Sequence, residues 1–506
     1  MKKLIFASFL LPLLFALGCG TGPGIHGIGG GGGTAGSYSN ASLNGAYVYQ
    51  LTGLDTNAAA LFQEAGIFTF DGNGHITSGI DDANEGGGVA TSASSGTYSV
   101  NSDGTGSFTL NLANGPSLSL SVTLASSSKV YLELNQFSGT GGAGTLNGAG
   151  IAEKQDPAAI AQIPSGTFAF RQHNIQSLQG AEANVGLMTV SAGAVSGNVD
   201  VNRNGVFDAN TSAPLAFTAG SLFSAPGSNG RFAGTGLLTL ADSSGVTSNY
   251  IYYIVDANNL RFLANDSGVI GLGRAEMQTG GPFTNASLSG QFAFGSRGDD
   301  AFSTFGVNSV GSFSISGAGT IGTGTVDTAK DGQNFLGISI TGGSYNFTSP
   351  NGRAQVTLNP QGGTPIQQIF WMVSPSRAFF ITNDATKEED GTATRQSGSF
   401  SNSTFNGQFA FLMDGFDTTA KDRVGTIQFN AGGTLNLNEV SDAGGASAGA
   451  TESGTYSVTS PTSGRTTAVI NGISSNFVFY PTSGTDAYML QNDPNVEIIG
   501  VMSLQH

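Results

Sequence analysis

Four stretches that read alike decide the fold, because each repeats the pattern glycine, any residue, aromatic, any residue, aromatic. They are Gly45-Ala-Tyr47-Val-Tyr49, Gly166-Thr-Phe168-Ala-Phe170, Gly290-Gln-Phe292-Ala-Phe294 and Gly407-Gln-Phe409-Ala-Phe411. Aromatic residues that alternate with smaller ones are typical of a β-strand with one buried face. Since the stretches recur about every 120 residues, we infer tandem repeats of one folding unit.

The repeats span residues 40–155, 164–278, 285–396 and 402–506, and each ends at or beside a repeated glutamine: Gln155, Gln278, Gln396 and Gln505. Within a unit, period-two runs alternate with turns such as Asp71-Gly72-Asn73-Gly74. In the third unit these runs predict strands near 290–295, 307–315, 319–327, 336–347, 353–359, 366–373, 377–383 and 391–397. Residues 57–64 carry a hint of helical periodicity.

These runs predict an all-β protein of four tandem antiparallel units with eight strands each. We expect closed up-and-down barrels, because closure removes the two exposed edges of a sheet. A barrel of this size has an interior that side chains or one small ligand can fill. Two other arrangements stay open: β-sandwiches, and an eight-bladed propeller in which each half-repeat is one blade.

At these residues the unit resembles the lipocalin-like, or calycin, class of barrels. The repeated opening is similar to that class's Gly-x-Trp first strand, with Tyr or Phe in place of Trp. The segments before three of the openings are alike and carry an apolar residue two positions before the glycine, at Leu43, Leu288 and Phe405. The resemblance implies that this residue plugs one end of the barrel. The second repeat has Pro164-Ser165 there instead, so a different plug is expected.

Composition excludes several classes of protein. The chain has 506 residues, 39% of them apolar and 10% charged, with 78 glycines and a formal net charge of -16. The apolar share is enough for a packed core, so disorder is not expected. The net negative charge argues against nucleic acid as a partner, since phosphates would be repelled.

The N-terminal segment predicts export and lipid anchoring. Lys2 and Lys3 precede an apolar run at 4–17, which is too short to span a bilayer. Residues 16–19, Ala-Leu-Gly-Cys, resemble the bacterial lipobox, and Cys19 is the single cysteine of the chain. We therefore expect a signal peptide at 1–18, acylation of Cys19 and a glycine-rich tether at 19–39. The expected partner is a lipid bilayer, and the expected location is the outer membrane or cell surface rather than the inner membrane.

Catalytic patterns are weak in this sequence. The histidines are His26 in the tether, His75 in a turn, His173 in a predicted loop and His506 at the end, so no two share a repeat position. Residues 445–449 match the Gly-x-Ser-x-Gly motif, but they lie in a Gly/Ala/Ser loop that leads into a strand, not between a strand and a helix. We expect a protein that is not an enzyme and has no cofactor.

One local motif is a candidate calcium loop. Asp200, Asn202, Asn204 and Asp208, with Gly205 at the sharp turn, match the start of an oxygen-ligand loop for Ca²⁺. Position twelve is Thr211 in place of the usual glutamate, so any affinity would be weak. A plain Asn/Gly hairpin turn is the other interpretation.

The repeated Asn-Asp pairs, such as Asn265-Asp266, and the repeated terminal glutamines are expected to cap turns and strand ends rather than to bind a ligand. We therefore expect an envelope lipoprotein that displays four β-domains for structural, adhesive or interaction roles. The alternative is the binding of small apolar ligands inside the barrels, which the lipocalin-like resemblance implies. The chain also resembles bacterial repeat lipoproteins, which implies architecture and location but no activity.

Overall fold

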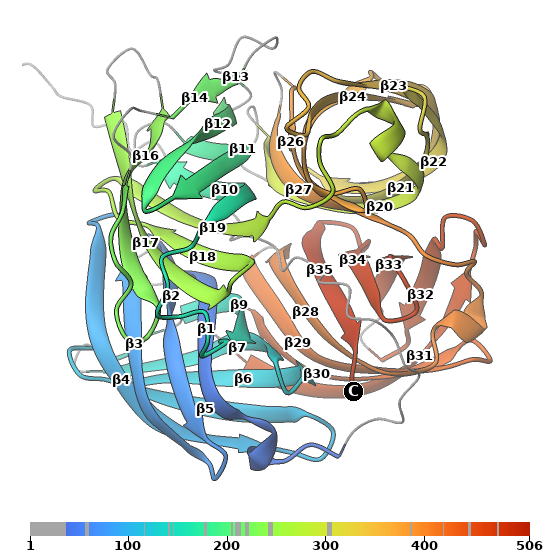
Figure 1. The fold of residues 1–506 in the computed structure, drawn as a ribbon. Helices are drawn as coiled ribbons and strands as arrows, with labels where there is room; N and C mark the ends of the chain where they lie inside the picture. The colour runs from blue at the N-terminus through green and yellow to red at the C-terminus, as the bar shows by residue number, and fades with distance from the viewer. Residues whose placement is uncertain are drawn as a thin grey trace, which may run out of the picture.

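The computed structural model describes residues 37–506 apart from 56–59, 116, 140–141, 145, 177–179, 204–205, 208–213, 218–221, 241–245, 301–305, 385–386, 418, 444–446 and 473–474. It is all-β and contains four closed eight-stranded antiparallel barrels (Figure 1). The first and last strands of each unit pair with each other. Closed barrels are therefore confirmed, and the sandwich and propeller alternatives are wrong.

Barrels 1 and 2 carry short additional strands beside their eight-stranded circuits, β8 in barrel 1 and β13 and β14 in barrel 2. The strands of barrel 1 are β1 (Asn44–Asp55), β2 (Ala60–Asp71), β3 (His75–Asn84), β4 (Val89–Val100), β5 (Thr105–Leu112), β6 (Ser117–Ser126), β7 (Lys129–Gly139), β8 (Gly142–Gly144) and β9 (Leu146–Lys154). The strands of barrel 2 are β10 (Gly166–Gln176), β11 (Gly180–Ser191), β12 (Ala194–Arg203), β13 (Val206–Phe207), β14 (Leu215–Ala216), β15 (Leu222–Phe223), β16 (Arg231–Leu240), β17 (Val246–Asp256), β18 (Asn259–Ala264) and β19 (Val269–Met277).

Barrels 3 and 4 are plain meanders whose neighbouring strands are consecutive in sequence. The strands of barrel 3 are β20 (Ser289–Asp300), β21 (Gly306–Ser316), β22 (Thr320–Lys330), β23 (Gln333–Phe347), β24 (Arg353–Pro360), β25 (Ile366–Ser374), β26 (Arg377–Thr382) and β27 (Lys387–Arg395). The strands of barrel 4 are β28 (Gly407–Asp417), β29 (Thr419–Asn430), β30 (Thr434–Ala443), β31 (Ser447–Val458), β32 (Thr466–Ile470), β33 (Ser475–Pro481), β34 (Asp486–Gln491) and β35 (Val496–Leu504).

Residues 60–64 belong to β2, so the helical interpretation of 57–64 is wrong for the part that the structure describes. The weak helical periodicity was outweighed by the pairing of β2 with β1 and β3 on either side.

Aromatic residues of the first strand fill the barrel interiors, and a glycine of the second strand makes room for them. A Cβ on Gly66 would lie 2.5 Å from a ring atom of Tyr49, and one on Gly311 would lie 2.6 Å from the ring of Phe294. Real carbon contacts are rarely shorter than about 3.4 Å. The repeated glycine is therefore required by the aromatic residue paired with it.

The predicted plugs are present in three barrels. Short 3₁₀ helices precede the first strands, and the apolar residue after each helix is buried in the barrel core. The helices are η1 (Asn40–Ser42), η2 (Asn285–Ser287) and η3 (Asn402–Thr404), and the buried residues are Leu43, Leu288 and Phe405. A tyrosine hydroxyl of the fourth strand holds each plug, as when Tyr98 donates to the Leu43 carbonyl at 3.0 Å. In barrel 2 the core contacts Ala159 and Ile160 instead.

The barrels form a closed ring. Figure 1 shows each barrel beside its neighbour in sequence and barrel 4 beside barrel 1. The first strands of one barrel pack against the last strands of the next: β1 and β2 on β17–β19, β10–β12 on β25–β27, β20–β22 on β33–β35, and β28–β30 on β6, β7 and β9. Such head-to-tail contacts close a ring when the rotation between units permits it. We call these contacts seams 1–2, 2–3 and 3–4, and the last one the closing seam.

Candidate functional site

Seam 2–3 contains a buried polar group that recurs at two other seams, and we call it the seam lock. Arg353, at the start of β24, donates to both carboxylate oxygens of Asp200 on β12, at 2.8 and 2.7 Å. The indole Nε1 of Trp371 donates to the same carboxylate at 2.7 Å. All three side chains are almost completely buried. On burial the carboxylate therefore loses its hydration and gains three charge-assisted hydrogen bonds from the next barrel.

The same geometry occurs at the other seams between consecutive barrels. The corresponding residues are Asp82, Arg231 and Tyr253 at seam 1–2, and Asp327, Arg465 and Tyr480 at seam 3–4. Burial raises the pKa of both tyrosine hydroxyls well above their ordinary value, so they remain protonated donors. Three seams thus share one mechanism of recognition.

The closing seam lacks the lock. The strand pair β29–β30 of barrel 4 corresponds to β2–β3 of barrel 1. When the two pairs are aligned, Val440 occupies the position of Asp82. Gln505 contacts the carbonyls of Asp103 and Leu124 in barrel 1. Thr105, two residues after Asp103, lies at the position of the arginine. Thr123, one residue before Leu124, lies at the position of the aromatic donor. All three lock positions have changed together, so no lock residue is left buried without its partner.

Other contacts hold the closing seam. An apolar cluster joins barrel 4 to barrel 1 and includes Tyr131, Ile151, Leu412 and Val501. The Tyr38 hydroxyl donates to the carbonyls of Ala125 and His506, both at 3.2 Å, and so brings the two ends of the described chain together.

Acidic residues are also buried at the closing seam. Asn147 donates to the Asp442 side chain at 3.1 Å. Burial, followed by nearby carboxylates, raises the pKa of Glu133 and of Asp422 well above the ordinary range. Deprotonation of these groups therefore weakens this seam.

The repeated glutamine joins the barrels at all four seams. Its side-chain amide donates to two carbonyls of the next barrel: Gln155 to Asn229 and Ile254, Gln278 to Asn351 and Met372, Gln396 to Ser463 and Pro481, and Gln505 to Asp103 and Leu124. The last of these contacts joins barrel 4 to barrel 1. These glutamines were expected to cap turns and strand ends, and the carbonyls that they contact belong to the neighbouring barrel.

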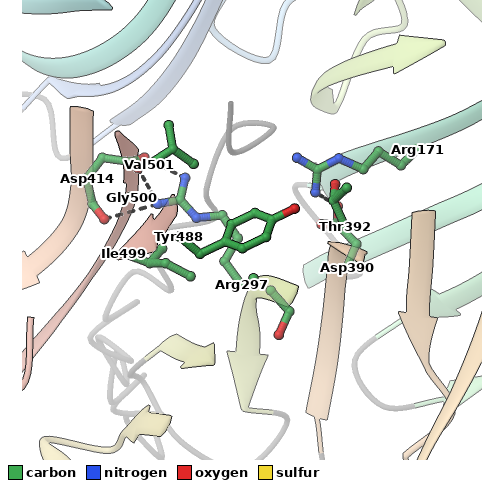
Figure 2. Close-up of a pocket in the computed structure, with 11 residues that line it drawn as sticks. Arg171, Arg297, Asp390, Thr392, Asp414, Tyr488, Ile499, Gly500 and Val501 are labelled. Carbon is green, nitrogen blue, oxygen red and sulfur yellow. Dashed lines mark hydrogen bonds and ion pairs between the residues drawn. The ribbon is translucent and has the colours of Figure 1, made fainter. Parts of the chain in front are cut away.

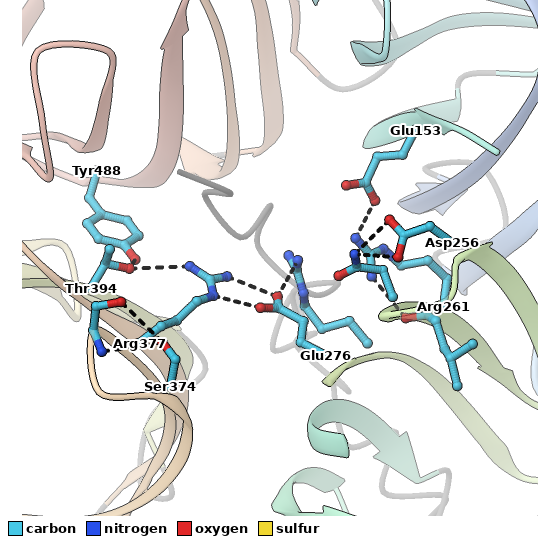
Figure 3. A network of polar contacts seen from close by, with 12 residues as sticks. Glu153, Asp256, Arg261, Glu276, Ser374, Arg377, Thr394 and Tyr488 are labelled. Atoms are coloured by element: carbon cyan, nitrogen blue, oxygen red, sulfur yellow. Dashed lines mark hydrogen bonds and ion pairs between the residues drawn. The ribbon is translucent and has the colours of Figure 1, made fainter. Parts of the chain in front are cut away.

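A charged network lies where the barrels meet (Figure 3). Arg377 of barrel 3 donates to both Glu276 oxygens of barrel 2 at 2.8 and 3.0 Å, and Arg261 of barrel 2 pairs with Glu153 of barrel 1. Burial and the neighbouring Arg261 lower the pKa of Arg274 to about 9. The network connects successive barrels through paired charges, which is a structural role.

Small cavities lie beside this network. One, of about 30 Å³, is lined by residues of three barrels, including Arg171, Asp390, Arg297, Asp414 and Tyr488 (Figure 2). A second, of about 20 Å³, is lined by residues of all four barrels. Each holds about one water molecule, so neither is a site for an organic ligand.

A larger cavity opens at the end of barrel 1 opposite its plug. It has a volume of about 240 Å³ and is lined by the carboxylates of Asp55, Glu64, Asp81 and Glu85 together with Leu61, Phe62, Leu112, Leu118 and six small or polar residues. Burial, followed by repulsion from Asp81 and Glu85, raises the pKa of Glu64 well above its ordinary value. Burial raises the pKa of Asp81 to about 6. The sequence did not reveal this site, because Glu64 lies in the segment that was interpreted as helical.

The calcium-loop residues are only partly described. Asp200 is the seam-lock carboxylate, so Arg353 and Trp371 already occupy its oxygens. Asn202 donates its side-chain amide to the carbonyls of Thr382 and Lys387 in barrel 3. Asn204 and Asp208 lie outside the described residues. The calcium loop stays a prediction.

Cys19, with the whole of 1–36, also lies outside the described residues, so lipidation stays a prediction. Of the Gly-x-Ser-x-Gly motif, residues 445 and 446 lie outside them too, and Ser447 begins β31. In the part of the chain that the structure describes, no helix is long and apolar enough to cross a bilayer.

His173 lies within β10, fully buried, and not in the loop that sequence analysis predicted for it. Its Nδ1 atom is 3.3 Å from an Asp390 oxygen and 3.6 Å from a Glu388 oxygen of barrel 3. One nitrogen and two carboxylates form a donor set that transition metals accept. However, Arg171 donates to Asp390 at 2.6 Å, and its positive charge opposes a bound cation.

No protein-family model and no curated protein matches this chain. Among solved structures, a double mutant of the vaccine antigen transferrin binding protein B from Haemophilus parasuis Hp5 is 9% identical, with 74% of this chain and 82% of that chain covered and a TM-score of 0.17. A protein of unknown function from the DUF3598 family of Nostoc punctiforme PCC 73102 is 10% identical, with 46% and 96% covered and a TM-score of 0.15. Likenesses at these TM-scores carry no argument about function.

Proposed function

We propose that the protein is a non-enzymatic lipoprotein of the bacterial cell envelope, which displays a rigid ring of four barrels on a lipid tether at Cys19. The observation that supports a single rigid body is the set of seams. Glutamine contacts join all four seams, and ion pairs to buried aspartates add to three of them. A ring held in this way keeps its outer surface in one arrangement, as a scaffold for interactions requires.

The tether reaches the ring at a defined place. Tyr38, near the start of the described chain, contacts Ala125 and His506 at the closing seam. A lipid on Cys19 would therefore hold the ring by the closing seam, with about 20 residues of the predicted tether between Cys19 and Tyr38. We place the ring at the outer membrane or cell surface.

Metabolic labelling tests the anchor. Cells expressing the full chain are grown with a tagged palmitate analogue, and the membrane fractions are separated. We expect label on the protein and recovery in the outer-membrane fraction, and we expect Cys19→Ser to abolish both. Label that persists in the Cys19→Ser variant, or an unlabelled wild-type protein, would contradict the anchoring proposal.

A second candidate function is ligand binding inside a barrel. The apolar cores of the barrels are filled by the protein's own side chains, such as the Tyr49 and Phe68 rings, which stack with centroids 4.0 Å apart. The observation that favours a ligand is the cavity of about 240 Å³ at the mouth of barrel 1. Native mass spectrometry of the full-length Cys19→Ser protein, isolated from the periplasm, tests for a bound molecule.

A further inference from the structure

The mouth of barrel 1 differs in charge from the same region of the other barrels. Barrel 4 carries Arg423 in the register of Glu64, and Glu439 in the register of Asp81. There the guanidinium donates to both oxygens of Glu439 at 2.9 and 2.8 Å. The acidic residue inside barrel 4 is therefore neutralised by a cation from its own barrel.

Barrels 2 and 3 are neutralised in the same way. In barrel 2, Arg203 donates to Glu182 at 2.9 and 2.7 Å, and in barrel 3 Lys387 pairs with Glu389. In the β2–β3 register, Arg203 corresponds to Glu85 of barrel 1. Each of these three barrels thus contains a buried acidic group next to a basic one.

Barrel 1 has the acidic groups without the basic one. None of the fourteen residues that line its cavity is a lysine or an arginine. Glu64 is 6% exposed, lines the cavity, and its Oε2 has no hydrogen-bond partner among the described residues. Asp81 accepts a hydrogen bond from the Tyr49 hydroxyl, which is neutral and leaves the charge uncompensated. A buried carboxylate without a partner is costly, and a cation from outside the protein would remove that cost.

We propose that the mouth of barrel 1 binds a small organic cation, an ammonium group on an apolar body, with Glu64 and Asp81 as its counter-ions. The charged group takes the place that the Arg423 guanidinium occupies in barrel 4. The apolar body contacts Phe62, Leu112 and Leu118 on the cavity wall. The site thus gives a chemical class to the second candidate function and rests on that candidate, whereas lipid anchoring is independent of it.

The dimensions of the cavity set the size of the ligand. A volume of about 240 Å³ equals that of about eight water molecules. It suits a molecule of roughly eight to ten non-hydrogen atoms, such as an arylalkylamine. Exposed Glu85 and Asn114 lie at the rim, so the cavity opens to solvent.

Calorimetric titration with phenethylamine tests the proposal. The full-length Cys19→Ser protein is titrated at about pH 8, where the amine is charged. Phenethyl alcohol, which has the same shape but no charge, and phenylacetate, which has the opposite charge, serve as matched ligands. We expect one site for the amine, affinity at least about tenfold weaker for the alcohol, and no binding of phenylacetate.

Two variants identify the site. Glu64→Gln removes one counter-ion and should weaken amine binding about tenfold or more. Glu64→Arg recreates the barrel 4 arrangement next to Asp81, and should abolish binding while raising the thermal midpoint. An increased stability together with lost binding distinguishes a binding residue from one that merely supports the fold. Glu439→Gln in barrel 4 is the control, and it should leave amine binding unchanged.

Some results would overturn the proposal. These are equal binding of amine and alcohol, no binding of the amine, unchanged binding in both Glu64 variants, or binding of Ca²⁺ in place of the amine. A failed titration leaves the lipid-anchor experiment unaffected, so the two proposals fail separately. If Glu64→Arg does not fold, Glu64→Gln alone decides the assignment.

Discussion

The three seams between consecutive barrels and the seam that closes the ring use the same faces but different chemistry. Consecutive barrels are joined by a linker and also share a buried aspartate, arginine and aromatic donor, as at Asp200, Arg353 and Trp371. The closing seam is not joined by a linker, and Val440, Thr105 and Thr123 occupy the lock positions. The closing seam is held instead by the side-chain amide of Gln505 and by an apolar cluster.

The difference teaches what the lock contributes. A buried ion pair gives little net stability over well-packed apolar residues, but it penalises every arrangement that leaves one charge unpaired. Four similar barrels could pair in several wrong orders. Three locks favour the contacts between successive faces, and the closing seam then forms between the two faces left over.

The largest expected effect is the removal of one lock cation. Arg353→Met leaves Asp200 buried without its guanidinium, so we expect a loss of about 3–5 kcal/mol in the free energy of unfolding. Denaturant unfolding followed by the fluorescence of Trp371, the single tryptophan and itself a lock residue, measures it. Thr105→Val at the closing seam is the control; it removes only the hydrogen bonds of a partly exposed hydroxyl and should cost less than about 1.5 kcal/mol. Equal losses at both positions would remove the distinction between the seams.

A smaller effect is expected from the glutamines. Gln278→Ala removes the side-chain amide donor from the carbonyls of Asn351 and Met372. Gln505→Ala removes it from Leu124 and leaves the Asp103 carbonyl with the Gln408 amide alone. We expect each variant to cost about 1–3 kcal/mol. The global stability should fall by similar amounts. Hydrogen exchange should distinguish the two variants. Loss of Gln505 makes the closing seam open more often, so the backbone amides of β28 and β35 should exchange faster in Gln505→Ala. If β35 stays as protected as in the wild-type protein, the closing seam is not the weaker one.

The smallest effect concerns pH. The raised pKa of Glu133 means that its contribution to stability is complete below the ordinary carboxyl pKa and is lost as pH rises through the raised value. Asp422 acts in the same direction. Stability should therefore fall as the pH rises from about 5 towards 8. Glu133→Gln should flatten this slope, and an unchanged slope would contradict the assignment to Glu133.

Much of the fold could be predicted because repetition amplifies a weak signal. One Gly-x-aromatic stretch says little, but four in register predicted the units, and the eight predicted strands of the third unit match β20 to β27. The plugs at Leu43, Leu288 and Phe405 were predicted from the same register.

The seams were not predicted, because polar residues within strands look like turn or loop residues when only one chain segment is considered. Asp200 was interpreted as a calcium ligand, and the glutamines as turn caps. Arg231, Arg353 and Arg465 recur at one repeat position, and this signal could have revealed the lock. The cavity in barrel 1 depends on which carboxylates face inward, and that was hidden while the register of β2 was unknown.

The contact between Tyr38 and His506 means that the ring has no fixed starting barrel. A circular permutant, in which a short peptide joins these two residues and the chain is opened within 156–163, should form the same ring. Seam 1–2, which carries a lock, would then be the seam whose formation bears the entropic cost of closing the ring. The barrels of the former closing seam would be covalently linked. We therefore expect the position of the chain ends, together with the lock, to determine which seam opens first.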